Sequence, residues 1–449
     1  MARRSSSDNR PQNLHVSRRD FLATSTAALA AGLFVNPLRA ADSKSPNEKL
    51  NIACVGTANQ AGWNISNLQS ENIVALCDVD SNYLGAAAQR NSQAKQYRDF
   101  RQMLDKEGKN IDAVLVATSD HTHAPATAMA LRMGKHVYCE KPLTHTVAEA
   151  RLIADLAKKA KVATQMGTQI HAGDNYRRTV ELVQAGAIGP VKEVHVWVGG
   201  AWANGRFNTG TPVPANLDWD LWLGPAAERP YTNNVHPAHW RDFWEYGGGH
   251  LADLGCHRID LAHWALDLRH PTACWAEGPE VHPDGCPAWL IVNWEYPARG
   301  DQPPVRLTWY HGGKQPDVLK TLKTKDGNPV NWGNGVLFIG DQGMLYSDYG
   351  NHVLLPEEKF ADYKRPAQTI PASIGHHQEW FRACKTGSPT TCNFDYAGAL
   401  TEAVLLGNVA YRCGQKLAWD ASKLKATNTT EADKFLNKAY RKGWDVFEV

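Results

Sequence analysis

Four titratable side chains recur at helical spacing within one short segment of the chain. His250, Asp253, His257 and Asp260 follow one another at intervals of three, four and three residues, so they share one face of a helix that we expect to begin near Gly249. Most other residues of the segment are apolar, and a polar stripe on a buried helix is costly unless each group is satisfied. The stripe is therefore a candidate for acid–base chemistry, which suits imidazole because its pKa lies near neutrality.

Two other interpretations of this stripe stay open. His250, Asp253 and His257 could ligate a metal ion, although the segment lacks the H-E-x-x-H pattern of many zinc sites. The four groups could instead form a hydrogen-bond network between helices, because buried polar groups are usually satisfied in that way. We favour acid–base chemistry and expect no metal.

A second set of residues predicts a dinucleotide site. The run Gly56-Thr57-Ala58-Asn59-Gln60-Ala61 fits the phosphate-binding pattern G-x-G-x-x-G/A, with alanine in place of the middle glycine. Asp78 follows about 20 residues later, where an acidic residue binds the adenosine ribose 2′-hydroxyl and repels a 2′-phosphate. Together the loop and Asp78 favour NAD over NADP, whereas the loop alone is also consistent with an ordinary strand-to-helix turn.

A third candidate is Lys141, in the run Glu140-Lys141-Pro142-Leu143 at the end of a predicted strand. A lysine at this position reaches the crevice beyond the strand ends, where it can hydrogen-bond a substrate hydroxyl and the nicotinamide ribose. The alternative is an exposed Lys–Glu pair of little energetic consequence. The run Thr118-Ser119-Asp120-His121-Thr122-His123 follows another predicted strand and so reaches the same crevice.

The elements that must position these groups alternate along the first part of the chain. Apolar runs predict strands at residues 50–55, 73–77, 113–117 and 136–139, and helical periodicity predicts helices at 126–133 and 147–160. Such alternation is typical of a doubly wound parallel sheet with its ligand crevice at the carboxyl ends of the strands. After residue 273, alternating runs such as 289–295 and 305–310 predict an open, mainly antiparallel sheet. The predicted fold class is therefore α/β, with a second, α+β domain.

Composition and charge exclude several classes of protein. A chain of 449 residues with 43% hydrophobic and 21% charged residues has material for two or three buried cores and is not a disordered chain. Six basic and two acidic residues lie in the first forty, which leaves a net charge of −2 on the rest. Because this near-neutral body offers no basic surface, we expect no nucleic-acid partner.

The first forty residues resemble a twin-arginine export signal. The pair Arg18-Arg19 precedes an apolar, alanine-rich run over residues 23–35, and Ala40 offers a small-residue cleavage site. We expect a signal peptide over residues 1–40, a linker over 41–48, export by the twin-arginine translocase, and a periplasmic or other extracytoplasmic location. An uncleaved signal that acts as a membrane tether is the alternative.

Three segments resemble the glucose–fructose oxidoreductase, inositol dehydrogenase and rhizopine-catabolism family, abbreviated Gfo/Idh/MocA. They are the dinucleotide loop, the strand end that carries His121 and His123, and especially Glu140-Lys141-Pro142. The D-x-x-x-H spacing of Asp253 and His257 carries the resemblance into the second half of the chain. It covers roughly residues 50–449. Members of this family mostly oxidise or reduce sugars and cyclitols with NAD(P).

The resemblance implies a domain division and roles for particular residues. It places a Rossmann domain at residues 49–168 and a domain for substrate binding and oligomerisation at 169–449, so we expect a homo-oligomer. Lys141, Asp253 and His257 are implied to be catalytic: His257 takes the hydroxyl proton as hydride leaves for the nicotinamide, and Asp253 binds a neighbouring hydroxyl or orients the imidazole. The implied cofactor-binding residues are Gly56, Ala58, Asn59, Asp78, Thr118, His123, Glu140, Lys141 and Gln169.

Tryptophan supplies candidates for substrate contact. Six of the 16 tryptophans lie between residues 197 and 244, and flat aromatic rings suit the C–H faces of sugars, although core packing is the ordinary alternative. Trp240 and Arg241 are the best candidates because they lie beside the glycine run 247–249, where the backbone allows close approach of a ligand.

These features predict an exported NAD-dependent oxidoreductase that acts on a sugar, sugar acid or cyclitol. Because free NAD is not regenerated outside the cytoplasm, we expect the cofactor to stay tightly bound. One alternative is an NAD-dependent glycosidase, which oxidises its substrate transiently, eliminates the leaving group and then returns the hydride. A second is a non-catalytic carbohydrate-binding protein whose cofactor loop has degenerated at Ala58.

Overall fold

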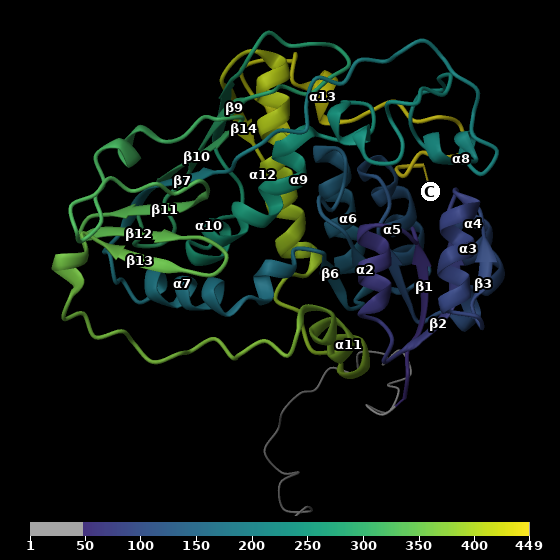
Figure 1. Cartoon of the computed structure of the whole chain (residues 1–449), viewed down its shortest axis with the longest axis horizontal. Coiled ribbons are helices and arrows are strands. Elements are labelled where there is room, and N and C mark those ends of the chain that lie inside the picture. The colour runs from purple at the N-terminus through teal and green to yellow at the C-terminus, as the bar shows by residue number, and fades with distance from the viewer. Residues whose placement is uncertain (1–47, 449) are drawn as a thin grey trace, which may run out of the picture. The chain divides into compact units, whose positions relative to one another are not determined.

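The structure, a computed structural model, describes residues 48–448 of the chain. Two β-sheets with helices packed against them account for most of this part (Figure 1). The predicted signal at residues 1–40 and the linker as far as residue 47 lie outside the described residues. Among the helices that the structure describes, none combines the length and the apolar character needed to cross a membrane.

The first sheet is parallel and has six strands in the order β3-β2-β1-β4-β5-β6. Its strands are β1 (Asn51–Val55), β2 (Asn72–Cys77), β3 (Lys95–Tyr97), β4 (Ala113–Val116), β5 (His136–Cys139) and β6 (Thr164–Met166). All four residues of β4 are completely buried, because a central parallel strand is covered by helices on both faces. The predicted doubly wound sheet is confirmed.

Helices from both ends of the chain cover this sheet. They are α2 (Gln60–Ser66), α3 (Ser81–Arg90), α4 (Phe100–Glu107), α5 (His123–Arg132), α6 (Val147–Ala160) and α11 (His376–Thr386). One face packs against apolar side chains of α2 and α3 and against Trp380 and Phe381 of α11, whereas α4 and α5 pack on the other. A helix near the C-terminus therefore completes a layer that the N-terminal half begins (Figure 1).

The strand order determines where a ligand can bind. Strands β1 to β3 extend in one direction, and the chain then returns to place β4 on the other side of β1. At such a switch point the loops after the strands diverge and leave a crevice. Gly56 follows β1, Asp78 follows β2, Thr118 comes shortly after β4 and Lys141 shortly after β5, so these four residues meet at one edge.

The second sheet has nine strands in the order β13-β12-β11-β7-β10-β9-β8-β14-β15. Its strands are β7 (Val191–Trp197), β8 (Ala273–Glu277), β9 (Leu290–Tyr296), β10 (Val305–His311), β11 (Gly335–Gly340), β12 (Gly343–Ser347), β13 (His352–Leu355), β14 (Leu417–Asp420) and β15 (Lys425–Ala426). All neighbouring pairs are antiparallel except β7 and β10, which are parallel. This confirms the predicted open, mainly antiparallel sheet.

The helices of the second half connect the two sheets. They are α7 (Asp174–Gln184), α8 (Trp219–Leu223), α9 (Gly249–Arg258), α10 (Asp260–Ala265), α12 (Phe394–Cys413) and α13 (Asp433–Leu436). The long, mostly buried α12 contacts α6 beside the first sheet and α9 and β8 in the second half (Figure 1). The boundary that we place between residues 168 and 169 stays a prediction.

Candidate active site

A cavity of about 450 Å³ lies at the carboxyl ends of β1, β2 and β4. It brings together predicted cofactor-binding residues from the first half of the chain and side chains from the second half. The lining residues include Gly56, Thr57, Ala58, Asn59, Asp78, Thr118, Trp202, Trp240, Arg241 and Asp253. The predicted dinucleotide loop and the predicted substrate contacts therefore face one space.

The loop after β1 packs directly against the end of β4 because Gly56 has no side chain. Gly56 has a φ of +91°, and a Cβ atom there would lie 2.3 Å from the carbonyl oxygen of Ala117, just beyond β4. Asn59 adopts a left-handed φ of 52° immediately before α2, which asparagine tolerates better than most residues. Ala58 does not adopt a positive φ, so the backbone needs no glycine at that position. The loop geometry thus fits a pyrophosphate group.

Asp78 closes the other side of this loop. One carboxylate oxygen accepts hydrogen bonds from the backbone N–H and the hydroxyl of Thr57, each at 2.9 Å, and the other accepts the N–H of Asp80 at 2.9 Å. Burial raises the pKa of Asp78, while these hydrogen bonds oppose the shift. A carboxylate held beside the loop at the end of β2 fits an adenosine ribose with a free 2′-hydroxyl.

The first prediction concerns this carboxylate. Asp78→Asn is expected to weaken NAD binding by about 10- to 100-fold, because a charged hydrogen-bond acceptor is lost. The preference for NAD over NADP is expected to fall as well, since the amide no longer repels a 2′-phosphate. Titrations of both dinucleotides by tryptophan fluorescence measure the two effects, with the exposed Asp105→Asn as a matched control. An unchanged ratio of NAD to NADP affinity would contradict the assignment.

Lys141 is held by a buried ion pair at the boundary between the two halves of the chain. Its ammonium donates to the carboxylate Oδ1 of Asp253 at 2.6 Å and to the backbone oxygen of the same residue at 2.8 Å. Both side chains are largely buried, with exposed fractions of 12% and 14%. The alternative of an exposed Lys141–Glu140 pair is therefore wrong, because Lys141 pairs with a residue of α9 instead.

The carboxylate of Asp253 accepts hydrogen bonds from three side chains. Besides Lys141, it accepts the Nε–H of Arg241 at 3.2 Å and the indole N–H of Trp202 at 2.8 Å. Burial alone would raise the pKa of Asp253, but Lys141 and Arg241 outweigh it and hold that pKa well below its usual value. The described hydrogen bonds of Asp253 include none to His257, so this carboxylate orients Lys141 rather than the imidazole.

The two predicted substrate contacts, Trp240 and Arg241, lie in the same cavity but differ in exposure. Trp240 is buried and only 5% exposed, and the guanidinium carbon of Arg241 lies 4.1 Å from the centre of its ring. Trp240 therefore acts as a platform for Arg241, in a cation–π arrangement. Of the two, the half-buried Arg241 has the side chain better placed to meet a ligand.

His257 lies one helical turn after Asp253 and faces a second cavity of about 460 Å³. That cavity is lined by Gln169, Ile170, Ala172, Gly173, His257, Tyr349 and His376. The Nδ1 atom of His257 is buried and has no hydrogen-bond partner among residues 48–448. Burial, assisted by the charge of Lys141, lowers the pKa of His257 well below its ordinary value. The imidazole is therefore neutral at neutral pH and can accept a proton.

Two residues predicted to bind the cofactor also hold the surrounding loops by hydrogen bonds. Glu140 is buried, and its Oε1 accepts hydrogen bonds from the amides of Gln60, Asn64 and Gln169 at 3.2, 2.8 and 2.8 Å. The ring nitrogens of His123 contact the backbone oxygens of Pro142 and Thr118 at 2.8 and 3.1 Å. Like Lys141, neither lines the cavity beside the dinucleotide loop, and their contacts with the cofactor stay predictions. Gln169 combines its bond to Glu140 with a place in the second cavity.

The predicted stripe on one helix divides into separate environments. Helix α9 ends at Arg258, and Asp260 begins α10, where its carboxylate contacts His171 at 3.0 Å and accepts the Tyr396 hydroxyl at 2.7 Å. His250 contacts the backbone oxygen of Gly199 at 2.9 Å. Only Asp253 and His257 face the cavities, and within residues 48–448 no group of three or more His, Cys, Asp or Glu side chains could hold a metal ion.

Three residues at the site give no signal of their own in the sequence. Trp202 reaches Asp253 from a long irregular segment, and it is one of several tryptophans in that part of the chain. Tyr349 comes from the turn between β12 and β13, and His376 begins α11. No spacing links these positions to Lys141 or His257, because the chain brings them together only through its tertiary fold.

The second prediction concerns Asp120, a buried carboxyl next to this site. Burial raises the pKa of Asp120 to about 8, against the opposing charge of Arg241. The unfolded chain loses this proton near its ordinary pKa of about 3.9, so between these pH values the folded state binds more protons. The free energy of unfolding therefore falls as pH rises through that window, by up to about 1.4 kcal/mol per pH unit from this group.

Asp120→Asn is expected to remove this contribution, because an amide of the same shape does not ionise. Relative to the unsubstituted protein, the variant gains stability progressively between about pH 5 and pH 8. Chemical denaturation at several pH values measures the difference. A difference in unfolding free energy that stays constant over this range would contradict the assignment.

The fold and this cavity define a dinucleotide-binding protein with a second, sheet-based domain. Residues 42–168 match the family model described as the oxidoreductase family, NAD-binding Rossmann fold, and residues 180–302 match the model of the same family described as the C-terminal alpha/beta domain. The chain therefore belongs to the Gfo/Idh/MocA family, as the sequence motifs indicate, and its first domain is an NAD-binding Rossmann domain.

Individual proteins that resemble this chain differ in how much of it they match. The myo-inositol 2-dehydrogenase of Thermotoga maritima is 29% identical over 238 residues, which cover 53% of this chain and 57% of the relative. The chain thus spans about half the length of the curated relatives it matches. The WlbA dehydrogenase of Bordetella pertussis, solved with NADH and UDP-GlcNAcA, is 15% identical with a TM-score of 0.58, covering 83% of this chain and 99% of that one.

A third similar protein is the aldose-aldose oxidoreductase of Caulobacter crescentus, solved with glycerol. It is 18% identical with a TM-score of 0.54, and the match covers 83% of this chain and 100% of that one. At these identities the two solved structures establish the fold. Both independently support the arrangement of a Rossmann domain followed by an open sheet.

Proposed function

We propose that this protein is an NAD-dependent oxidoreductase that transfers hydride between the cofactor and a CH–OH group of a sugar, sugar acid or cyclitol. The observation that carries the proposal is the fixed ammonium of Lys141, held by Asp253 at 2.6 Å beside a neutral His257 at the carboxyl edge of the Rossmann sheet. Bound NAD supplies the hydride acceptor. Gly56, Asn59, Asp78 and their neighbours would hold it in the 450 Å³ cavity.

Lys141 and His257 have different roles in the proposed proton transfer. An ammonium has three N–H donors, and Lys141 uses two of them on Asp253, which leaves one for a substrate hydroxyl. His257 offers an unprotonated imidazole nitrogen that can take the hydroxyl proton as the C–H bond is broken. The ion pair with Asp253 keeps Lys141 in one orientation, so little rearrangement is needed during the reaction.

The substrate class is supported by the relatives. One is named for myo-inositol and one for aldoses, which are small, polyhydroxylated molecules. The second cavity, with His257, Gln169 and His376 among its walls, offers several hydrogen-bonding groups to such a molecule. We propose Arg241 as a further substrate contact, resting on its place over Trp240 and next to Asp253.

Export and cofactor retention complete the proposal. The twin-arginine motif at Arg18 and Arg19 supports export in the folded state, to the periplasm or another extracytoplasmic compartment. A cofactor that is not regenerated there must remain bound between successive reactions, so we propose tightly held NAD and alternate oxidation and reduction of two substrates. A homo-oligomer built through the second domain is part of the same proposal.

Acid or heat denaturation of the purified protein, followed by mass analysis of the supernatant, tests the retention of the cofactor. We expect close to one NAD or NADH per chain. A protein purified without dinucleotide would contradict tight binding, and a failure to bind added NAD would contradict the whole proposal. An aryl glycoside that releases its aglycone with no net NADH would replace the oxidoreductase by the glycosidase alternative.

A further inference from the structure

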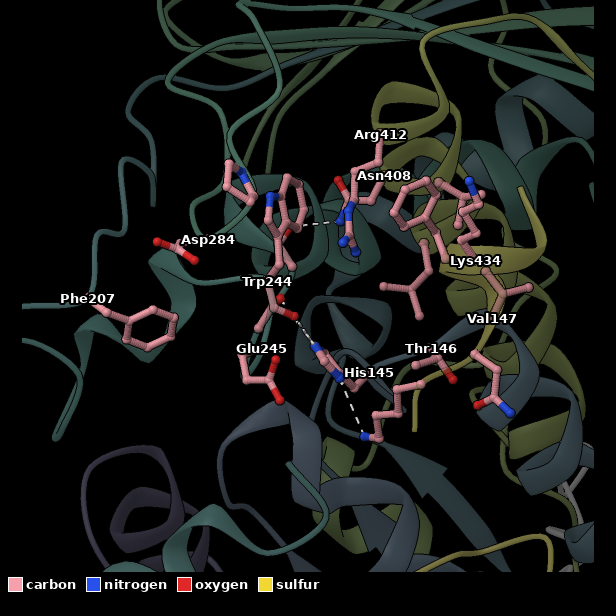
Figure 2. Close-up of a pocket in the computed structure, with 18 of the residues that line it drawn as sticks. His145, Thr146, Val147, Phe207, Trp244, Glu245, Asp284, Asn408, Arg412 and Lys434 are labelled. Atoms are coloured by element: carbon pink, nitrogen blue, oxygen red, sulfur yellow. Dashed lines mark hydrogen bonds between the residues drawn. The ribbon is translucent and has the colours of Figure 1, made fainter. Parts of the chain in front are cut away.

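A polar pocket of about 260 Å³ lies apart from both cavities of the candidate active site (Figure 2). It is formed by the segments 145–147, 244–248, 283–284 and 434–438, by residues of α12, and by Phe207 and Arg229. None of its lining residues belongs to the walls of the other two cavities. The proposed hydride transfer therefore does not account for this pocket.

The most unusual group in the pocket is the guanidinium of Arg412, in the last turn of α12. Within residues 48–448 it forms no hydrogen bond and no ion pair. Its central carbon lies 4.2 Å from the ring centre of Phe435 and 5.1 Å from that of Trp244. The two rings hold the cation in place while its N–H donors stay available to a ligand.

Unused acceptors face the same space. The carboxylate of Asp284 has no hydrogen-bond partner in the described part of the chain, and Glu245 accepts only the backbone N–H of Ala227, at 2.9 Å. In Figure 2, Asp284 lies to the left of Trp244 and Glu245 lies below it, whereas Arg412 and Lys434 lie to the right. The pocket thus offers donors and acceptors from different directions.

The charges of the pocket are nearly balanced. Lys434 pairs with Glu431 at 2.6 Å, and Lys438 pairs with the buried Glu149 at 2.9 Å. The remaining charged side chains in its walls are two cations and two anions: Arg229, Arg412, Glu245 and Asp284. Such a balance favours a neutral ligand rich in hydroxyl groups over a simple anion, because each hydroxyl can both donate and accept.

The volume and the aromatic walls narrow the class of ligand further. A space of 260 Å³ equals the share of about nine water molecules in the liquid, at about 30 Å³ each, so it suits one sugar or cyclitol ring. Phe435, Phe207 and Trp244 supply apolar surface for the C–H groups of such a ring.

We infer that this pocket is a second binding site, for a single sugar or cyclitol ring, in which hydroxyl groups donate to Glu245 and Asp284 and accept from Arg412. The inference stands on the pocket alone and is independent of the proposed reaction. The imidazole of His145 contacts the backbone oxygens of Trp244 and Gly247 at 3.0 and 3.3 Å, so two walls of the pocket are bonded to each other.

Fluorine NMR of the protein labelled with fluorotryptophan tests this inference with D-glucose and myo-inositol as probes. Trp244→Phe identifies the resonance of Trp244, which reports on this pocket alone. We expect at least one probe to shift that resonance in a saturable way. Arg412→Gln is expected to raise the midpoint by at least about tenfold, the effect of losing a hydrogen bond to a charged group.

The exposed Arg269→Gln, which loses a surface pair with Asp395, is the matched control and should leave the midpoint unchanged. A Trp244 resonance that does not shift with either probe would overturn the inference. So would a midpoint in Arg412→Gln equal to that of the unsubstituted protein. If Arg412→Gln does not fold, as judged by its thermal unfolding, Asp284→Asn carries the same test. NAD binding by the same samples keeps a failure here distinct from a failure of the proposed function.

Discussion

Lys141→Met is expected to lower kcat by about 10²- to 10⁴-fold, the range that a positioned proton-transfer group contributes. Methionine keeps much of the length of the side chain but loses the ammonium that Asp253 holds at 2.6 Å. Because the dinucleotide loop and Asp78 are untouched, NAD binding should stay close to that of the unsubstituted protein. Steady-state kinetics and a separate dinucleotide titration distinguish the two effects.

The substitution also leaves the carboxylate of Asp253 without its main partner, so folding must be checked by thermal unfolding. Lys95→Met is the matched control, because Lys95 is exposed, pairs with Glu107 instead of Asp253, and lines neither cavity of the site. Retention of most of the turnover in Lys141→Met would show that this lysine is not part of the chemistry.

His257→Gln is expected to lower kcat by a comparable factor, about 10²- to 10⁴-fold, because glutamine cannot accept the hydroxyl proton. In the unsubstituted protein, burial and Lys141 depress the pKa of His257, so the proton-accepting form persists below the ordinary histidine pKa of about 6.5. The rate of oxidation, measured as kcat/KM, should therefore decline only well below the ordinary titration range of histidine. The pH profile measures this directly.

His250→Gln is the matched control for this prediction, since His250 lies on the same helix but contacts the backbone oxygen of Gly199. We expect it to keep most of the activity. An acid limb at or above the ordinary histidine pKa of about 6.5, or equal losses in the two glutamine variants, would contradict the role of His257 as the proton acceptor.

Much of the structure of the Rossmann domain can be predicted from the sequence, because its strands and turns are determined by residues close together in the chain. Strands β1, β4 and β5 are apolar runs bounded by polar turns, and parallel strands must end at one edge. The order of strands and helices alone therefore predicts that Gly56, Asp78 and Lys141 lie together. The positive φ of Gly56 is likewise a conformation that the glycine itself suggests.

The roles of polar side chains at this edge are harder to predict. Glu140 is adjacent to Lys141, yet it accepts hydrogen bonds from the side-chain amides of Gln60, Asn64 and Gln169. Lys141 instead forms its ion pair with Asp253, more than a hundred residues later in the sequence. These hydrogen-bond and ion-pair partners depend on how α2 and α9 pack against the strand ends in the tertiary structure. Sequence spacing carries no information about which carboxylate a given lysine meets.

The division of the polar stripe has a similar cause. No proline interrupts the segment, yet α9 ends at Arg258 and α10 starts at Asp260. The buried contacts of Asp260 with His171 and Tyr396 come from distant parts of the chain and hold Asp260 in an environment separate from that of Asp253 and His257. Helical periodicity alone predicts one continuous face, because it does not include such long-range bonds.

The most direct test of the proposed hydride transfer is a single-turnover experiment on the protein loaded with NAD. The loaded protein is mixed with sugars and cyclitols, including myo-inositol and D-glucose, and the near-ultraviolet absorbance of NADH is recorded. We expect NADH to form on the protein in amounts close to one per chain with at least one substrate, and not to form in Lys141→Met. A protein that binds neither NAD nor NADP, or one whose Lys141→Met variant forms NADH at the same rate, would contradict the proposed function.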